Sequence, residues 1–472
     1  MKEYDEVEIK ANPDEVFRNR ASTVNEKGKR NWIYAMKPKG KLYSLRNYFS
    51  WFYFAIFFAM PFIKLNGMPF VQLNFVEAKF ILFGKIFWPQ DFFIFAVAMI
   101  VAIISVVLFT VVYGRLFCGW ICPQTFFMEM MFRKVEWAIE GSKSQQIKLN
   151  NSPWNTEKIV KRGGKHIAFF LLSFIIANTF LSYILGIDEL KKIISEPVSE
   201  SALLFSGLLF FTTLFYVIYA FVREIVCTTI CPYGRLQGVM FDKNTMQIAY
   251  DYERGERRGK LRKNSTEVKG DCIDCMKCVH VCPTGIDIRN GVQMECIGCT
   301  ACIDACNEVM FKIDKPLGLI RYASENEIAK KEKFRFTTRL KGYTILLVAL
   351  IGFMAALIAS RKSVDTFISR AKGQLYQDLP DNKYGNLYNA KILNKTNKEK
   401  EVTFKVENLN AVIKLVSNHG IHLKREAINE TTFFIEIDKA NVLKRTTDLE
   451  IGVYENNIKI QTVKTTFLGP FK

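Results

Sequence analysis

All twelve cysteines of this 472-residue chain fall into four motifs, and their arrangement constrains the fold more than any other feature of the sequence. Two of the motifs follow one another and share the spacing C-x-x-C-x-x-C-x-x-x-C. Their members are Cys272, Cys275, Cys278 and Cys282 in the first run, and Cys296, Cys299, Cys302 and Cys306 in the second. This spacing is typical of the ligands of two [4Fe–4S] clusters.

The order of the cysteines also predicts which of them share a cluster. In two-cluster ferredoxins the fourth cysteine of each run binds the other cluster. We therefore expect one cluster on Cys272, Cys275, Cys278 and Cys306, and a second on Cys296, Cys299, Cys302 and Cys282. Structural zinc sites match less well, because they use cysteine pairs separated by a dozen or more residues. Disulfides match less well still, because the loop charges described below place these thiols in the reducing cytoplasm.

Several stretches of the chain are apolar enough to cross a membrane. Five of them contain no Lys or Arg for about 17 residues or more, which is enough to span a hydrocarbon core about 30 Å thick. They are residues 47–63, 91–113, 166–187, 199–222 and 342–360. We expect an α-helical membrane protein with about five transmembrane helices.

The net charge of +19 is distributed unevenly among the loops. Lys and Arg number nine in residues 114–165 and 21 in residues 223–341, but three in residues 64–90 and two in residues 188–198. Short basic loops stay in the cytoplasm. The pattern therefore indicates a membrane protein with a cytoplasmic N-terminus, cytoplasmic cysteine motifs and an external C-terminus. It also makes a nucleic-acid partner the poorer explanation of the charge.

These features divide the chain into five expected parts. They are a basic cytoplasmic tail (1–42), a four-helix transmembrane domain with both C-x-x-x-C-P motifs (43–240), a ferredoxin-like domain with its linker (241–340), a fifth transmembrane helix (341–360) and an all-β domain (361–472). The last part contains no cysteine. Its short stretches rich in β-branched and aromatic residues, such as 401–406, 432–437 and 449–454, predict strands of an immunoglobulin-like sandwich.

The remaining four cysteines form the pairs Cys118/Cys122 and Cys227/Cys231, which directly follow the second and fourth apolar stretches. If C-x-x-x-C is helical, both sulfurs of a pair lie on one face and can bind one soft ion. Cu(I) favours such thiolates. The four sulfurs also fit a third iron–sulfur site, two dithiols that cycle with disulfides, or a structural role. We expect the neighbouring Arg115, Arg223 and Arg235 to favour the thiolate form.

The sequence around these pairs resembles a known family. Cys118-Gly119-Trp120-Ile121-Cys122-Pro123-Gln124 and residues 227–237 (CTTICPYGRLQ), followed by the two cluster motifs, are similar to the CcoG/FixG/RdxA family of cytochrome oxidase accessory proteins. Near the C-terminus, Gly373-Gln374-Leu375-Tyr376 and residues 465–470 (TTFLGP) are similar to the immunoglobulin-like domain of that family. The likeness covers nearly the whole chain.

The resemblance implies a cupric reductase in a bacterial inner membrane, with its C-terminal domain in the periplasm, that supplies Cu(I) for assembly of a cbb-type cytochrome c oxidase. By the same resemblance, Cys118, Cys122, Cys227 and Cys231 are copper-binding catalytic thiolates, and copper passes to a transporter, a chaperone or oxidase assembly factors. The sequence does not identify the electron donor. Two other functions fit the motifs: a quinol-linked membrane electron conduit to a partner redox enzyme, and a redox-sensing scaffold for oxidase assembly.

Overall fold

The computed structural model describes residue 23 and residues 29–470, apart from short gaps within that range. The gaps are residues 66, 76–78, 83, 89–90, 196, 198–201, 261–268, 333–336, 372, 374, 381, 397, 417–419, 426 and 443. Most of the expected N-terminal tail, residues 1–22 and 24–28, lies outside the described residues, as does Gln374 of the family-like segment.

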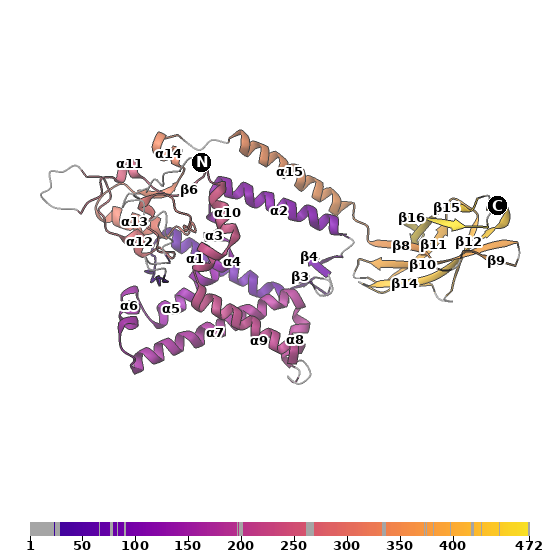
Figure 1. The fold of residues 1–472 in the computed structure, drawn as a ribbon, viewed down its shortest axis with the longest axis horizontal. Coiled ribbons are helices and arrows are strands. Elements are labelled where there is room, and N and C mark those ends of the chain that lie inside the picture. Colours follow the sequence, from indigo (N-terminus) through magenta and orange to yellow (C-terminus); the bar gives the residue numbers. More distant parts are fainter. Residues whose placement is uncertain are drawn as a thin grey trace, which may run out of the picture. The chain divides into compact units, whose positions relative to one another are not determined.

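The chain forms two compact units, each built from segments that are distant in sequence (Figure 1). The first unit comprises Met1–Ala59, Ala98–Ser182 and Asp188–Ile351, and therefore holds all twelve cysteines. The second comprises Met60–Val97, Tyr183–Ile187 and Gly352–Lys472. Any site formed by the cysteines consequently belongs to a single unit.

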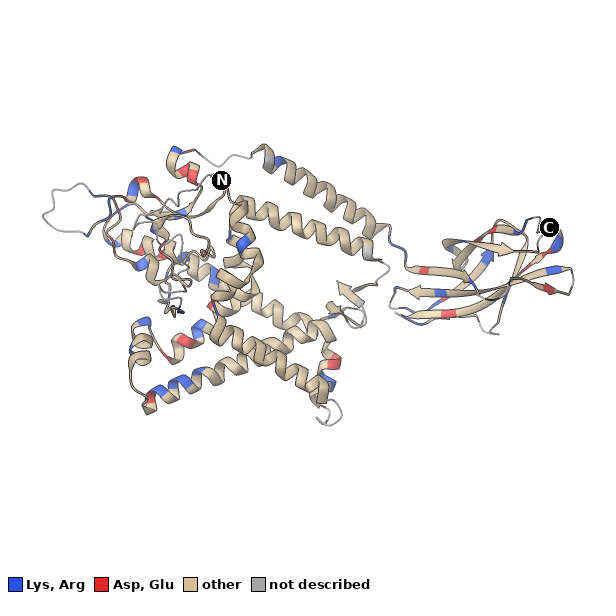
Figure 2. Ribbon diagram, in the orientation of Figure 1, with Lys and Arg blue, Asp and Glu red and all other residues tan. Residues whose placement is uncertain are grey.

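Four helices among the described residues are long and apolar enough to span a membrane. The spans are Phe93–Tyr113, Thr156–Leu185, Ala202–Val222 and Leu340–Ala359. They lie in α2 (Phe92–Tyr113), in α7 (Thr156–Leu185), in α9 (Ala202–Val217) with its π-helical extension η5 (Ile218–Val222), and in α15 (Thr338–Ala359). Figure 2 shows α2 and α9 almost free of charged residues, whereas the charges of α7 gather at one end. Both features suit a helix with an apolar midsection.

The first expected span forms a helix that does not meet the same criteria. This helix, α1, covers Lys41–Ala59 and is followed by the 3-10 turn η2 (Met60–Phe62). It carries two cations, and one of them, Arg46, is buried against protein together with Ser50. Because only four helices of the described residues meet the criteria, the count of five transmembrane helices is not confirmed.

Short helices connect the long ones in the first unit. After α2 come α3 (Leu116–Trp120), α4 (Pro123–Phe127), the π-helix η4 (Met128–Phe132), α5 (Arg133–Ile139) and α6 (Lys143–Asn151). After α7 come α8 (Ile187–Ser195), α9 with η5, the π-helix η6 (Val226–Ile230) and α10 (Pro232–Met240). An aromatic core joins α1, α4, η4, α7 and the α9–η5 segment, and within it Phe132 lies stacked on Tyr219 with ring centroids 4.4 Å apart.

A small α+β domain with the cluster motifs completes the first unit. Its antiparallel strands β6 (Gln247–Tyr250) and β7 (Ile320–Ala323) pair from Gln247↔Ala323 to Tyr250↔Ile320. Between and after them lie α11 (Tyr252–Gly255), α12 (Lys277–His280), the 3-10 turn η7 (Ile288–Asn290), α13 (Ala301–Lys312) and α14 (Glu325–Lys330). The core between strands and helices contains Ile248, Ile303 and Met310 as well as most of the cluster-motif cysteines.

The second unit contains the expected β-sandwich. One sheet has the order β12-β14-β10-β8, with β9 beside β10, and the other has the order β13-β11-β15-β16. The strands are β8 (Val364–Arg370), β9 (Gln377–Leu379), β10 (Lys383–Asn394), β11 (Lys400–Val406), β12 (Ala411–Leu415), β13 (Ile421–Leu423), β14 (Ile428–Asp438), β15 (Thr446–Glu455) and β16 (Ile458–Leu468), with the 3-10 turn η8 (Lys439–Asn441) after β14. The three predicted strands fall within β11, β14 and β15, and their buried residues form the core between the sheets.

The same unit includes residues 60–97, which form two small sheets. They are the pair β1 (Lys64–Leu65) and β2 (Met68–Pro69), and the three-stranded sheet of β3 (Val71–Asn74), β4 (Lys79–Leu82) and β5 (Lys85–Phe87). Asp91, just before α2, is buried and contacts two cations from later in the chain, Arg361 at 2.7 Å and Lys395 at 2.5 Å. Burial alone would raise the pKa of Asp91, but hydrogen bonds from Arg361 and Lys395 outweigh it and lower that pKa.

We predict that Asp91→Asn lowers the free energy of unfolding by about 3 kcal/mol, because it leaves buried cations without their shared carboxylate. In the wild type, the contribution of ionised Asp91 to the free energy of unfolding is present at neutral pH. It is lost as the pH falls below the ordinary Asp pKa of 3.8, because the pKa of Asp91 in the folded protein is lowered. Thermal unfolding of the full chain in detergent measures the change.

Glu430→Gln is the matched control for this substitution. Glu430 pairs with Lys391 at 2.7 Å, but both side chains are about two-thirds exposed, at 64% and 65%. Loss of such an exposed pair costs about 0–1 kcal/mol. Equal melting temperatures for Asp91→Asn, Glu430→Gln and the wild type would show that Asp91 does not hold its two cationic partners in place.

Candidate functional site

The two cluster loops adopt the same backbone conformation. In the first loop the third and fifth residues, Asp274 and Met276, have φ of 53° and 56°. In the second loop the equivalent Gly298 and Thr300 have φ of 69° and 67°. Left-handed residues at matching positions reverse the chain in the same way twice. Each loop then leads into a short helix, α12 or α13, which carries its third cysteine.

The sulfurs of each run line small cavities that match the predicted ligand sets. One cavity is lined by Cys272, Cys275, Cys278 and Cys306. The other is lined by Cys282, Cys296, Cys299 and Cys302, together with Cys278. The fourth cysteine of each run thus faces the cavity of the other run, as the ferredoxin pattern requires. These side chains fit two [4Fe–4S] clusters, and the assignment of individual ligands stays a prediction.

Two buried arginines bring positive charge to the second cavity. Burial raises the pKa of Cys299 to about 12 and that of Cys296 to about 11, while Arg46 opposes the shift at Cys299 and Arg115 opposes it at Cys296. Arg46 Nη2 and Arg115 Nε are buried and donate no hydrogen bond to any described residue. A cluster with four thiolate ligands carries net negative charge, so unpaired guanidinium donors beside it fit its presence.

The two C-x-x-x-C-P motifs fold alike, but not as one helix turn. Cys118 lies within α3 and Cys227 within η6, whereas Cys122 and Cys231 have extended backbone with ψ of 124° and 113°. The helical condition under which both cysteines of a pair would share one face is therefore not met. The reason is the following proline, which disfavours helical backbone at the residue before it and instead starts α4 and α10.

The two motifs pack against each other through their sulfurs. The Cys118 thiol donates to Gln237 Oε1 of the second motif at 3.3 Å, and Cys227 Sγ lies 3.8 Å from Thr125 Oγ1 of the first. Gln237 and Thr125 are both buried. Cys118 and Cys227, the first cysteine of each motif, are therefore each held by a polar side chain from the segment of the other motif.

Burial dominates the protonation of these thiols. It raises the pKa of Cys118 to about 11, against the opposing charge of Arg115, and that of Cys227 to about 12. Nearby thiols, among them Cys122 and Cys231, raise both pKa values further. Arg115 thus acts on Cys118 in the expected direction, but burial outweighs it and favours the protonated thiols at Cys118 and Cys227. A bound cation would have to displace their protons.

The spacing of the four sulfurs limits how they can bind a metal. Within the described part of the chain, no three His, Cys, Asp or Glu side chains are close enough to hold one metal ion. All twelve cysteines are described and none forms a disulfide. Coordination of one ion by three or four thiolates would thus need side-chain movement, whereas coordination by two soft thiolates suits Cu(I).

A buried ion network holds the chain just before Cys227. Arg223 has a left-handed backbone with φ of 56°, and its guanidinium donates to both oxygens of Glu136 at 3.0 and 2.9 Å. Lys165 lies 3.6 Å from Glu136 and 2.8 Å from Glu140. Burial would raise the pKa of Glu136, but the charge and hydrogen bonds of Arg223, together with the charges of Lys165 and Arg133, outweigh it and lower that pKa to about 2. The network therefore stays ionised at neutral pH.

The first membrane motif touches the second cluster loop backbone to backbone. A Cβ added at Gly119 would lie 2.6 Å from the carbonyl oxygen of Gly298 and 2.7 Å from that of Ile297. A Cβ added at Gly298 would lie 2.7 Å from the Arg115 carbonyl oxygen. Arg46 Nε donates to the Gly119 carbonyl at 2.8 Å, which fixes the contact from the other side. Only glycine at both positions permits this approach.

Sequence reasoning identified the cysteines of the site but missed the residues that join them. Arg46 lies in α1, more than 70 positions before the Gly119 carbonyl that it binds, and no motif marks it. Tyr322, whose hydroxyl donates to the Gly298 carbonyl at 3.2 Å, is equally unmarked. Gly119 and Gly298 were visible inside two motifs, and a glycine between metal ligands is a signal for close backbone approach.

Comparisons with known proteins agree with this geometry. Models of a 4Fe-4S dicluster domain, a 4Fe-4S binding domain and the IG-like fold at the C-terminal of FixG match residues 222–325, 95–140 and 354–470. RdxB of Cereibacter sphaeroides is 32% identical over 85% of this chain and 87% of its own length. RdxA of the same organism is 33% identical over 71% and 73%. The nitrogen fixation protein FixG of Rhizobium meliloti is 36% identical over 55% and 50%.

We predict that Gly119→Ala loosens the contact between the membrane motif and the cluster loop. The added methyl group overlaps backbone atoms that cannot rotate away, and overpacking of this kind costs about 1–3 kcal/mol. Cys118 and Cys227 should then become accessible, so a maleimide reagent should label the iron-loaded variant faster than the wild type.

Gly163→Ala on α7 is the control for this experiment, because a Cβ there meets nothing within 4 Å. It should label at the wild-type rate. Iron content reports whether the eight cluster-motif cysteines stay protected in each sample. Equal labelling of Gly119→Ala, Gly163→Ala and the wild type would contradict a tight contact at Gly119.

Proposed function

Since the chain belongs to the FixG/RdxA family, whose relatives and domains mark it as a membrane iron–sulfur electron-transfer protein, we propose that it reduces Cu(II) to Cu(I). The proposed copper-binding residues are Cys118, Cys122, Cys227 and Cys231, and the proposed cluster ligands are the eight cysteines of the two runs. The Cu(I) formed would serve assembly of a cbb-type cytochrome c oxidase.

One observation carries the proposal: the membrane-motif sulfurs pack against the second cluster loop. Cys118 and Cys227 contact the buried group that contains Cys299, with Ile297 and Ala301 on either side of it. The glycine contact between Gly119 and Gly298 holds this arrangement. Cysteines that can bind a soft metal ion thus pack against the same buried group of residues as a cysteine that fits a cluster.

The chemistry of these groups matches a one-electron reduction. When bound, [4Fe–4S] clusters supply single electrons, and conversion of Cu(II) to Cu(I) takes one. The paired thiols favour the product, because sulfur ligands select Cu(I) over Cu(II). Thr125 and Gln237 orient the first sulfur of each pair, and binding of the cation releases the thiol protons. These residues therefore bind the copper substrate and stabilise its reduced form.

The proposal includes a membrane orientation. Residues 1–42, both C-x-x-x-C-P motifs in 43–240 and the cluster domain in 241–340 would lie on the cytoplasmic side or open to it. The helix at 341–360 would lead to a periplasmic immunoglobulin-like domain in 361–472. The excess of Lys and Arg in residues 114–165 and 223–341 supports this orientation, and a bacterial inner membrane is the proposed location. Copper would pass to a transporter, a chaperone or oxidase assembly factors.

A second candidate is an electron conduit that uses the membrane motifs as a third cluster site. It is favoured by the match of a 4Fe-4S binding domain model to residues 95–140, which contain Cys118 and Cys122. Iron content separates the two candidates. Two clusters require about 8 iron atoms per chain and a third raises this to about 12. A value near 12 that falls by about 4 in a variant without the membrane-motif cysteines would favour the conduit.

We predict that Cys118→Ala with Cys122→Ala abolishes Cu(I) production above the uncatalysed background. Iron content should stay at about 8 per chain, because none of the eight cluster-motif cysteines is changed. The measurement is anaerobic formation of the Cu(I)–chelator complex by reduced protein supplied with Cu(II). Thr229→Ala, an exposed position within the second motif, is the control and should keep the wild-type rate. Wild-type Cu(I) production by the double variant would contradict copper reduction at these thiols.

A further inference from the structure

We propose that the lysine-rich pocket between the segment before α1, helices α5 and α6, and the cluster domain binds a flavin mononucleotide. This deepens the proposed function, because it names the chemical class of the electron donor on which that function rests. The pocket has a volume of about 570 Å³. That value lies within the range of about 300–1,000 Å³ typical of sites for small molecules and cofactors.

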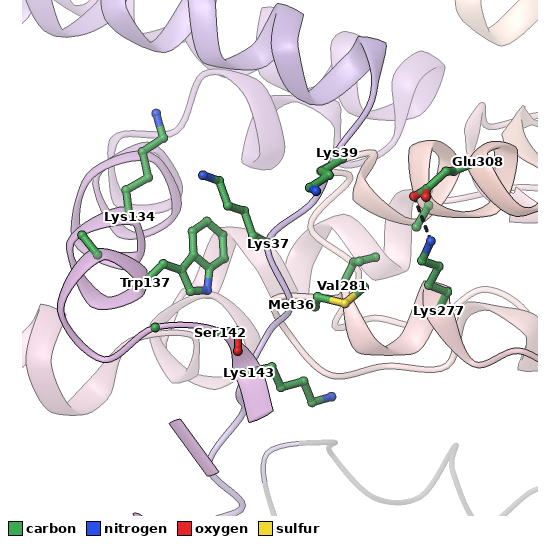
Figure 3. A pocket seen from close by; sticks show the side chains of 13 residues that line it. Met36, Lys37, Lys39, Lys134, Trp137, Ser142, Lys143, Lys277, Val281 and Glu308 are labelled. Carbon is green, nitrogen blue, oxygen red and sulfur yellow. Dashed lines mark hydrogen bonds and ion pairs between the residues drawn. The ribbon is translucent and has the colours of Figure 1, made fainter. Parts of the chain in front are cut away.

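The pocket is strongly basic (Figure 3). Its charged lining consists of five lysines and one glutamate, namely Lys37, Lys39, Lys134, Lys143, Lys277 and Glu308. The lining therefore has a net charge of four positive units. Only Lys277 is neutralised by this glutamate, at 2.8 Å, and Glu308 is shared with Lys312 at 2.7 Å outside the pocket.

The other lysines of the pocket have no acidic partner among the residues that the structure describes. Within the described part of the chain, Lys37, Lys39 and Lys143 form no ion pair, and Lys134 donates to the neutral amide of Asn47. Burial and the positive charges of Lys37 and Arg46 lower the pKa of Lys134, and burial lowers that of Lys143. Several lysines around one pocket without an acidic partner favour a ligand that carries negative charge, and lysines are common partners of phosphate oxygens.

The pocket also offers a surface for a planar ring. Trp137 lies in its wall, and its Nε1 donates to the Ala35 carbonyl at 3.1 Å, which fixes the indole. Figure 3 shows Trp137 beside Lys37, with Met36 and Val281 on the adjoining wall. Aromatic rings stack favourably on tryptophan, and the sulfur of methionine adapts to an aromatic neighbour. A ligand with phosphate at one end and a ring at the other satisfies both parts of the pocket.

The position of the pocket relates it to both clusters. Lys277, Val281 and Ala305 line it, and each immediately precedes a cluster-motif cysteine: Cys278, Cys282 and Cys306 respectively. Cys278 and Cys306 belong to the first predicted ligand set and Cys282 to the second. A redox-active ring here would lie beside the backbone that holds ligands of both clusters.

Electron counting selects the flavin among phosphate-bearing rings. A reduced flavin gives up two electrons and two protons to become the oxidised flavin, and it can release the electrons one at a time. Two clusters accept one electron each, so the count balances with the protons passing to water. A nicotinamide nucleotide transfers both electrons together as hydride and does not match single-electron acceptors directly.

The test is a titration of the iron-loaded full chain in detergent with oxidised flavin mononucleotide, without copper, followed by flavin fluorescence and calorimetry. We expect saturable binding at one site per chain. The double variant Lys37→Gln with Lys143→Gln should weaken binding about tenfold or more, because it removes two charge-assisted contacts. Lys148→Gln, an exposed position on α6 outside the pocket lining, should bind like the wild type.

Two competing ligands and the flavin titration itself can each give a result that contradicts the proposed flavin site. Inorganic phosphate that binds as tightly as the flavin would reduce the pocket to a simple anion site. Tighter binding of a nicotinamide nucleotide would assign the pocket to that class instead. Absence of flavin binding to the wild type would overturn the site altogether. So would equal flavin binding by the wild type and the double variant, provided that the variant has a normal iron content. Copper takes no part in this titration. Flavin binding can therefore be absent although the protein reduces Cu(II), and flavin can bind although the protein does not reduce Cu(II).

Discussion

The architecture of the site depends on one backbone contact, the approach of Gly119 to Gly298. It joins the first C-x-x-x-C-P motif to the second cluster loop with no side chain between them. The first loop has Asp274 where the second has Gly298, although both positions are left-handed, and the Asp274 carboxylate binds Arg289 at 2.6 Å instead. The two halves of the ferredoxin-like domain thus differ where one of them must meet the membrane motif. The two cluster loops therefore have different residues at this position because only the second loop contacts the first C-x-x-x-C-P motif.

Two buried arginines, Arg46 and Arg115, lie near this contact and bring positive charge to it. Arg46 binds the Gly119 carbonyl and its charge lowers the pKa of Cys299, while the charge of Arg115 lowers the pKa of both Cys118 and Cys296. Isolated buried cations are costly unless paired. Thiolate-bound clusters on one side and thiolate-bound copper on the other would provide the missing negative charge. The arginines therefore suit a site that carries anionic metal complexes on both sides of a thin protein layer.

The sequence predicted the parts of the protein better than their junctions. Local patterns predicted the two cluster loops, the strands within β11, β14 and β15, and four of the apolar helices, because spacing and periodicity are local properties. Cys118 and Cys122 do not lie on one helix turn, although the sequence pattern allowed it. Pro123 was the local signal against it, because a proline disfavours helical backbone at the residue before it. Arg46 and Tyr322 act through tertiary contacts, which no local pattern encodes. Burial of Cys118 likewise outweighed the nearby Arg115.

The most direct test of cupric reduction is a single-turnover experiment without oxygen. Iron-loaded protein is reduced, freed of excess reductant and mixed with Cu(II), while cluster absorbance and chelated Cu(I) are recorded together. We predict one Cu(I) for each cluster electron lost, and no such coupling in a variant that lacks Cys118, Cys122, Cys227 and Cys231. Clusters that stay reduced, or equal Cu(I) yields from the wild type and that variant, would contradict this prediction.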